Sequence, residues 1–276
     1  MTYNDWLMNT TKELQAVSHS PRLDADILLG LVTGQSKAHL LAYIDTPLTL
    51  QEQGALQRKI ERRMAGEPMA YISGTIEFYG HDFMVNEKVL VPRPESESFL
   101  ELLHELRKTQ RVHNLVDIGT GSGVLAISAK LAHPDLYITA TDVSNSALSV
   151  AAENSLQHKA PITLRNQSLL TGDKEGYDVL FANLPYVPTN PVPDPSIAHE
   201  PPSALFSGSD GLDHYRKLFK QLAPKHIRFV MVESLANQHT AVQALAQAAD
   251  YTLCDSAGLV QLFTKNGDTT DRKSVV

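Results

Sequence analysis

The feature that most constrains the fold is a glycine-rich segment between an apolar stretch and a helical one. Residues 117–123 read D-I-G-T-G-S-G; they overlap the end of the apolar stretch Leu115–Ile118 and precede the helical stretch Val124–Ala132. Glycine adopts positive φ without steric strain, so glycines at alternate positions let a strand turn tightly into a helix. The first N–H groups of such a helix lack intrahelical partners. The segment therefore predicts a strand, loop and helix that hold a ligand against bare backbone.

The second half of the chain alternates between apolar strands and helical stretches. The expected strands are Leu115–Ile118, Tyr137–Thr141, Val179–Ala182 and Phe229–Val232, and the expected helices include Val124–Ala132 and Ala147–Gln157. Near-continuous apolar strands that alternate with helices are typical of a parallel sheet covered by helices on both faces. The sequence therefore predicts an α/β fold with a doubly wound, mostly parallel, Rossmann-like sheet.

The first part of the chain has a different texture. Between Tyr3 and Met64 apolar residues recur at helical spacing, and prolines and glycines interrupt the pattern, which predicts four or five short helices. The following stretch, rich in β-branched and aromatic residues, predicts a β-hairpin. We expect a helical domain over residues 1–70, a β-hairpin linker over 71–94, the α/β domain over 95–266 and a disordered tail over 267–276.

One helical face in the first domain is basic. It carries Arg58, Lys59, Arg62 and Arg63. Such a face is most often a solvated helix surface, but it is also compatible with docking of an acidic or nucleic-acid-bearing partner. The sequence leaves both interpretations open.

Composition argues against several classes of protein. The chain has 276 residues, 42% hydrophobic and 20% charged, and runs such as Ile27–Val32 are far shorter than the roughly 18 residues of a membrane span. Met1–Thr11 lacks the basic and apolar regions of a signal peptide, so we expect a cytoplasmic protein with no membrane contact. The formal net charge of −7 gives no broad attraction to phosphates, so no stable nucleic-acid binding is expected.

Cysteine and histidine usage argues against disulfide and metal sites. The single cysteine, Cys254, cannot form an intramolecular disulfide and excludes a multi-cysteine zinc site, which suits a reducing compartment. We interpret it as a small apolar filler. The eleven histidines form no close ligand pair with acids at metal-site spacing, so we expect no metal.

The glycine loop carries an acid that decides its ligand. Its G-x-G-x-G spacing differs from the dinucleotide fingerprint G-x-G-x-x-G, and Asp117 would repel a pyrophosphate but attract an ammonium group. The pattern D-x-G-x-G-x-G resembles the first motif of class I methyltransferases, which implies S-adenosylmethionine as the cofactor. The residues implied are Asp117, Gly119, Thr120, Gly121, Ser122 and Gly123. A glycine-rich turn without a ligand is the alternative.

A second acid, Asp142, follows the strand Tyr137–Thr141. An acid about 20 residues beyond a glycine loop, at the tip of the second strand, accepts hydrogen bonds from ribose hydroxyls in doubly wound nucleotide-binding domains. Asp142 fits that role. Alternatively, its side chain is the N-cap of the helix that starts near Ser146.

The tetrapeptide Asn183-Leu184-Pro185-Tyr186 follows the buried strand Val179–Ala182, at the carboxyl end where open α/β sheets bind ligands. It resembles the N-P-P-Y and N-I-P-Y motifs of methyltransferases that act on planar nitrogens, whose lone pair is delocalised. The resemblance implies that the Asn183 side-chain oxygen and the Leu184 carbonyl accept N–H hydrogen bonds, that Pro185 stiffens the turn and that Tyr186 stacks on the planar group. An ordinary Asn-x-Pro turn is the alternative.

Further stretches make the resemblance more specific. They are Gly66–Pro68, Tyr71–Gly74, Glu77–Gly80, Leu90–Glu97 and the segment from His199 to Leu212. In combination with the two motifs above, they resemble the release factor glutamine methyltransferases, from about Gly66 to Thr264. The resemblance implies that peptide chain release factors are the protein substrate, methylated on the glutamine of their Gly-Gly-Gln motif. It also implies that the helical domain grips this partner. We expect a monomer.

Two departures from the family pattern matter. Ser168 and Leu169 stand at cofactor-binding positions where the family often carries an acid and a large apolar residue, so the cofactor affinity could be lower. Leu184 replaces Pro or Ile, which is tolerable because that position acts through its backbone.

Three other functions remain as alternatives. An adenine-N6 methyltransferase acting on RNA or DNA would use the same tetrapeptide, but the net charge and the short first domain argue against it. A non-catalytic cofactor-binding protein would have no use for Asp117, Asn183 and Tyr186. An NAD-dependent dehydrogenase has a different glycine spacing.

Overall fold

The computed structural model describes residues 1–189 and 197–267. Within this range the chain forms two compact units, one of residues 1–75 and 197–199 and one of residues 76–189 and 200–267. The helical domain expected over 1–70 lies in the first unit, which extends to Thr75. Of the tail expected over 267–276, residues 268–276 lie outside the described range.

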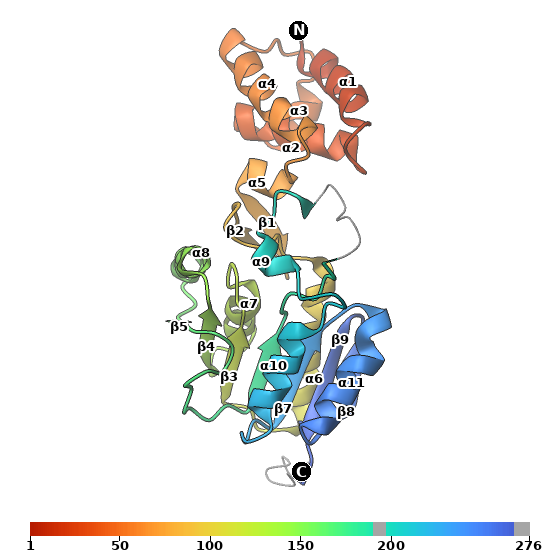
Figure 1. Ribbon diagram of the computed structural model, residues 1–276. Coiled ribbons are helices and arrows are strands. Elements are labelled where there is room, and N and C mark those ends of the chain that lie inside the picture. Colours follow the sequence, from red (N-terminus) through yellow and green to blue (C-terminus); the bar gives the residue numbers. More distant parts are fainter. Residues whose placement is uncertain (190–196, 268–276) are drawn as a thin grey trace. The chain divides into compact units, whose positions relative to one another are not determined.

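The first unit is a bundle of short helices, as the apolar spacing predicts (Figure 1). They are α1 (Tyr3–Leu14), α2 (Pro21–Thr33), α3 (Lys37–Ala42), α4 (Leu50–Met64) and α5 (Met69–Ser73). Thr2 and Thr49 each form a capping box, which satisfies N–H groups at the starts of α1 and α4. Trp6, Leu28 and Leu56 belong to the apolar core between the helices, which is what holds such short elements in place.

The basic face of α4 is largely engaged within its own unit. Arg62 contacts Glu67, with 2.7 Å between its Nε and the carboxylate. Arg63 donates to Asp24 at 2.8 Å, and Lys59 Nζ donates to the Ile72 carbonyl at 3.1 Å. These three cations therefore help to hold the bundle together, whereas Arg58, the fourth cation of the face, is exposed.

The second unit contains a two-stranded hairpin and a seven-stranded sheet. The hairpin strands are β1 (Thr75–Phe78), whose first residue belongs to the other unit, and β2 (His81–Met84). The sheet strands are β3 (Asn114–Ile118), β4 (Tyr137–Asp142), β5 (Thr163–Asn166), β6 (Val179–Ala182), β7 (Phe229–Glu233), β8 (Tyr251–Ala257) and β9 (Val260–Lys265). Their order is β5-β4-β3-β6-β7-β9-β8. All neighbours from β5 to β7 pair in parallel, whereas β9 pairs antiparallel with β7 and with β8.

Helices cover both faces of this sheet (Figure 1). The helices described in this unit are α6 (Ser98–Thr109), α7 (Val124–Ala132), α8 (Asn145–Gln157), α9 (Pro202–Leu205), α10 (Asp213–Leu222) and α11 (His239–Ala248), with 3-10 turns η1 (Pro94–Glu97) and η3 (Ala236–Gln238). Successive side chains of a strand enter different cores: Phe181 packs with α6 and α7, and Leu180 packs with α10 and α11. The doubly wound, mostly parallel sheet predicted from the sequence is confirmed.

The interpretation of Cys254 as a small apolar filler is wrong. Cys254 is exposed and lies on β8, which is the edge strand of the sheet. Only one side of an edge strand is paired, and four further residues around Cys254, over 252–256, are exposed as well. Composition alone does not reveal which strand becomes an edge.

Candidate active site

The glycine loop lies between β3 and α7, with Gly119, Gly121 and Gly123 at φ of 73°, 56° and 83°. Any other residue would be strained at these angles. A Cβ at Gly119 would also lie 3.0 Å from the Leu184 side chain, and one at Gly123 would lie 3.0 Å from Ile127. A Cβ at Gly121 would meet no atom within 4 Å. The middle glycine therefore faces open space, and its two neighbours are confined by protein atoms.

Asp117 lies beneath this loop and is 1% exposed. Burial raises the pKa of its carboxyl group to about 7, even though a hydrogen bond from Thr120 favours the ionised form. The Thr120 hydroxyl donates to Asp117 Oδ2 at 2.6 Å, and the negative charge of Asp142 adds to the upward shift. Among these neighbours no cation balances the carboxylate, so the site favours a positively charged ligand group.

Asp142 ends β4 and ties the strand to the glycine loop. Its Oδ2 accepts the Gly121 N–H at 3.0 Å, and its Oδ1 accepts the Ser144 N–H at 2.8 Å. The N-cap of α8 is Ser144, whose hydroxyl accepts from Ala147 N at 3.2 Å. The alternative interpretation of Asp142 as the helix cap is therefore wrong. A carboxylate has about four acceptor sites, so Asp142 retains capacity for ligand hydroxyls.

A cavity of about 480 Å³ opens beside the loop, within the size range of small-molecule sites. Of the residues expected at the site, it is lined by Gly119, Gly121, Asp142, Ser168, Leu169, Asn183, Leu184 and Pro185. A smaller cavity of about 60 Å³ shares some of these walls and is lined in addition by Asp117, Thr120 and Ser122. Gly123 and Tyr186 line neither cavity. Gly123 serves as the N-cap of α7, with a left-handed conformation.

The segment after β5 forms another wall of the larger cavity. Leu169 has a φ of 49°, which is unusual for a residue with a branched side chain. Gln167 stabilises this turn by donating from Nε2 to the Leu169 carbonyl at 3.1 Å. Gln167 itself lines the cavity beside Ser168, although sequence reasoning did not select it.

Asn183 follows β6 and lines both cavities. Its Nδ2 donates to the Ser96 hydroxyl at 2.9 Å, which leaves the amide oxygen as the acceptor of that side chain. Ser96 in turn donates to Glu233 Oε2 at 2.6 Å, and the Tyr186 hydroxyl donates to Glu233 Oε1 at 2.9 Å. The tetrapeptide therefore rests on a buried carboxyl group that sequence reasoning missed.

The environment of this carboxyl group shifts two pKa values upward. Burial raises the pKa of Glu233, against the lowering effect of the hydrogen bonds that Ser96 and Tyr186 donate. Burial and the charge of Glu233 also raise the pKa of Tyr186, so its hydroxyl stays protonated. One signal in the sequence could have indicated Glu233, since it directly follows the apolar stretch Phe229–Val232.

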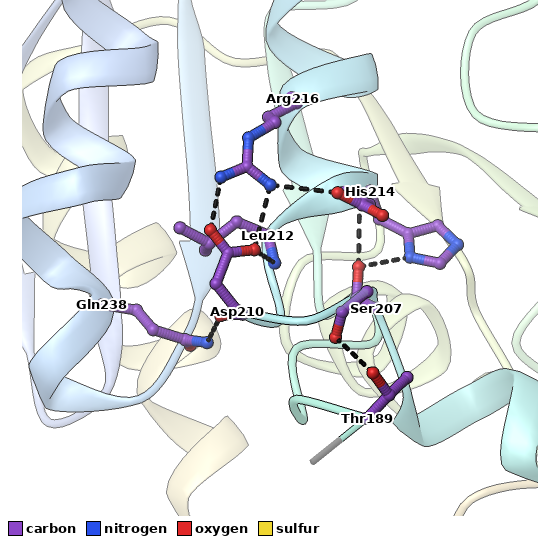
Figure 2. Close-up of polar contacts among 9 residues, drawn as sticks. Thr189, Ser207, Asp210, Leu212, His214, Arg216 and Gln238 are labelled. Atoms are coloured by element: carbon purple, nitrogen blue, oxygen red, sulfur yellow. Dashed lines mark hydrogen bonds and ion pairs between the residues drawn. The ribbon is translucent and has the colours of Figure 1, made fainter.

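Gln238 of η3 and the segment before α10 contact the backbone of the tetrapeptide, and Figure 2 shows Gln238 and Arg216 at Asp210. Gln238 Nε2 donates to the carbonyls of Tyr186 and Asp210, both at 2.9 Å. Gly211 has a φ of 79°, and a Cβ there would lie 2.1 Å from the Tyr186 carbonyl oxygen. Arg216 holds Asp210 through both of its terminal nitrogens. The backbones at Tyr186 and at residue 211 approach each other so closely that residue 211 must be glycine.

Beneath this segment, Ser207 and His214 connect it to α10 (Figure 2). The Ser207 hydroxyl and His214 Nδ1 lie 2.6 Å apart, and His214 N–H donates to the same hydroxyl at 3.0 Å. Ser207 is 1% exposed, so this pair is structural rather than a nucleophile and base open to a substrate. Burial lowers the pKa of His214.

Neither a metal-ligand cluster nor a membrane-spanning helix occurs in the described part of the chain. Within residues 1–189 and 197–267, no group of three or more His, Cys, Asp and Glu side chains is arranged to hold a metal ion. The absence of a metal requirement stays a prediction. No helix in the same ranges is long and apolar enough to cross a membrane.

Comparison with known proteins places these features in a family. Residues 5–74 match the PrmC N-terminal domain, and residues 96–200 match the methyltransferase small domain. The chain is 34% identical over 252 residues to the release factor glutamine methyltransferase of Coxiella burnetii, covering 88% of this chain and 89% of that protein. It is 37% identical over 259 residues to the enzyme of the same name from Moorella thermoacetica, covering 88% and 90%.

A solved structure agrees with the fold. The hMettl16 catalytic domain, in complex with MAT2A 3'UTR hairpin 1, is 14% identical, with a TM-score of 0.54 over 87% of this chain and 92% of that one. This likeness concerns the fold alone. The identities to the two bacterial relatives extend over most of both chains. The chain therefore belongs to the release factor glutamine methyltransferase family.

Proposed function

We propose that this chain transfers a methyl group from S-adenosylmethionine to the side-chain amide nitrogen of the glutamine in the Gly-Gly-Gln motif of peptide chain release factors. The observation that carries the proposal is the orientation of Asn183 at the carboxyl end of β6. Its Nδ2 is used by Ser96, so its oxygen is the atom available to an acceptor N–H. The names of the relatives support the same substrate.

The cofactor fits the chemistry of the larger and smaller cavities. S-adenosylmethionine carries an ammonium, a ribose and a sulfonium, and when bound it supplies an electrophilic methyl group. The buried carboxyl group of Asp117 suits the ammonium, and Arg93, which lines the same smaller cavity, is paired with Glu200. Asp142 suits the ribose hydroxyls, and Gly121 leaves room for a ligand against backbone. Ser168, Leu169 and the neighbouring Gln167 would border the base.

The tetrapeptide would orient the acceptor. A carboxamide nitrogen is a poor nucleophile because its lone pair is delocalised into the carbonyl group. Asn183 Oδ1 and the Leu184 carbonyl each accept one N–H of the acceptor, which aims the nitrogen at the methyl group. Pro185 stiffens this turn, and Tyr186 stacks on the planar amide while its hydroxyl stays on Glu233. The new N–C bond replaces the S–C bond, and the displaced amide proton leaves to solvent.

The helical unit would grip the release factor, and the methylation would take place in the cytoplasm on a monomeric enzyme. The charge balance does not favour bulk nucleic acid, because the formal net charge is −7 and three cations of α4 are engaged within their own unit.

A direct assay tests the proposal. The purified protein is incubated with methyl-labelled S-adenosylmethionine and either a release factor or bulk RNA and DNA. We expect label in the release factor and none in nucleic acid. Asn183→Ala should slow transfer by roughly 10²–10³-fold, the usual loss for one preorganised polar group. Label in adenine, with an unlabelled release factor, would replace this function by adenine-N6 methylation.

A further inference from the structure

Glu233 is a buried acid that the proposed reaction does not use directly. It ends β7, is 0% exposed and lines neither cavity of the site. Both of its carboxylate oxygens receive a hydroxyl, one from Ser96 and one from Tyr186. Glu233 is therefore not placed to take a proton from the acceptor, because protein groups occupy both oxygens and no solvent reaches it.

The direction of the hydrogen bond from Ser96 to Glu233 determines how the Asn183 amide is oriented. The Ser96 hydroxyl has a single proton, and it donates that proton to Glu233 Oε2 at 2.6 Å. The Ser96 oxygen then has only lone pairs to offer to Asn183. The Asn183 side chain can meet a lone pair only with its NH₂ group, which is the contact observed at 2.9 Å. The opposite amide orientation would place two acceptors against each other.

The orientation of Asn183 matters for the acceptor. With Oδ1 toward the cavity, Asn183 accepts a hydrogen bond from the glutamine NH₂ group. After a half-turn of the amide, two NH₂ donors would face each other, and the acceptor nitrogen would be repelled rather than held. The shape of the side chain is the same in both states, so packing alone does not choose between them.

We propose that Ser96 and Glu233 are positioning residues that lock the Asn183 amide with its oxygen toward the methyl acceptor. The inference deepens the proposed function and rests on it. Three elements that are distant in the sequence supply the parts: η1 carries Ser96, the end of β6 leads into Asn183, and β7 ends in Glu233. Glu233 lines neither cavity and Ser96 lines only the smaller one, and we place their effect on the acceptor through Asn183.

The kinetic test compares Ser96→Ala with two matched variants. Ser96→Thr keeps the hydroxyl, and Ser98→Ala removes a hydroxyl two residues away that belongs to neither the lock nor the cavities. We expect Ser96→Ala to lower kcat by about tenfold, the effect of one net hydrogen bond, and to change kcat more than the cofactor Kd, although Ser96 also lines the smaller cavity. Ser96→Thr and Ser98→Ala should stay within about twofold of the parent. Thermal unfolding of each variant identifies losses caused by misfolding.

A second comparison separates positioning from a general structural role. If Ser96 acts through Asn183, its removal should matter little once Asn183 has no amide. In the Asn183→Ala background we therefore expect Ser96→Ala to change kcat by less than about twofold. Glu233→Gln keeps the shape of the side chain but offers an NH₂ donor to one of the two hydroxyls. It should lower kcat in the parent and should change kcat by less than about twofold in the Asn183→Ala background. Equal fold losses in both backgrounds would overturn the proposal.

A measurement without any acceptor keeps this inference separate from the proposed function. The side-chain NH₂ signals of Asn183 are assigned in the nitrogen–proton NMR spectrum by their disappearance in Asn183→Ala. We expect Ser96→Ala to shift these signals and to speed their exchange with solvent, and Ser98→Ala to leave them in place. Unchanged signals in Ser96→Ala would refute the lock. If the parent methylated no release factor, the proposed function would fail while this spectrum still decided the lock.

Discussion

Among single residues, the three loop glycines differ in what surrounds them. Gly119 and Gly123 are confined by Leu184 and by Ile127, whereas Gly121 faces the cavity. We expect Gly121→Val to weaken S-adenosylmethionine binding at least tenfold, because the new side chain would fill ligand space. Gly80→Val is a matched control, since Gly80 also has positive φ with no atom within 4 Å of its Cβ position and lines neither cavity. Calorimetry on both folded variants measures the difference; equal affinities would exclude the loop as the cofactor site.

The raised pKa of Asp117 predicts that cofactor binding depends on pH. Its pKa of about 7 means that the carboxyl group is mostly neutral below neutral pH, whereas the proposed ammonium contact requires the ionised form. Cofactor affinity should therefore rise as pH increases through about 7, and it should fall by about tenfold for each unit below that value. Asp117→Asn should bind more weakly and show little of this pH dependence. A parent affinity that is flat between pH 5 and pH 8 would contradict the assignment.

The raised pKa of Asp117 also makes the stability of the ligand-free protein depend on pH. The folded pKa lies above the ordinary value of 3.8, so the folded chain holds this proton more tightly than the unfolded chain. The contribution of Asp117 to stability is fully present below pH 3.8 and is lost as pH rises to about 7. Bound cofactor should offset that loss, which a series of unfolding curves with and without ligand would measure.

At the scale of elements, the tetrapeptide is held by segments distant in sequence. Gln238, in η3, donates to the carbonyls of Tyr186 and Asp210. Gln238→Ala would leave two carbonyls without this donor, so we expect a loss of about 1–3 kcal/mol of unfolding free energy and a lower kcat. Gln247→Ala, exposed on the following helix α11, is the control. A stability equal to the parent in Gln238→Ala would show that the clamp is not needed.

The elements themselves were largely predictable from the sequence. Apolar runs such as Val179–Ala182 are strong signals for buried strands, and the glycine loop fixes the turn into α7. The contacts of Ser96 with Glu233 were not predictable, because they join residues 137 positions apart and depend on where η1 meets the sheet. Cys254 was misjudged for a similar reason, since strand order determines which strand is an edge.

At the scale of the whole molecule, the two units suggest a division of labour. Every described residue that lines the two cavities near the glycine loop belongs to the α/β unit. Deleting the residues before about Gly66 should therefore raise the KM for the release factor by more than it changes the cofactor Kd. Kinetics with the release factor and calorimetry with the cofactor provide the two values. A deletion that weakened cofactor binding more than acceptor binding would contradict this division.

The most direct measurement concerns the product of the reaction. A release factor is treated with S-adenosylmethionine and either the parent chain or Asn183→Ala, and the peptide that contains Gly-Gly-Gln is sequenced by mass spectrometry. The account predicts one methyl group on the glutamine side chain with the parent and roughly 10²–10³-fold slower formation with the variant. An unmodified glutamine with the folded, cofactor-bound parent, or equal methylation by Asn183→Ala, would contradict it.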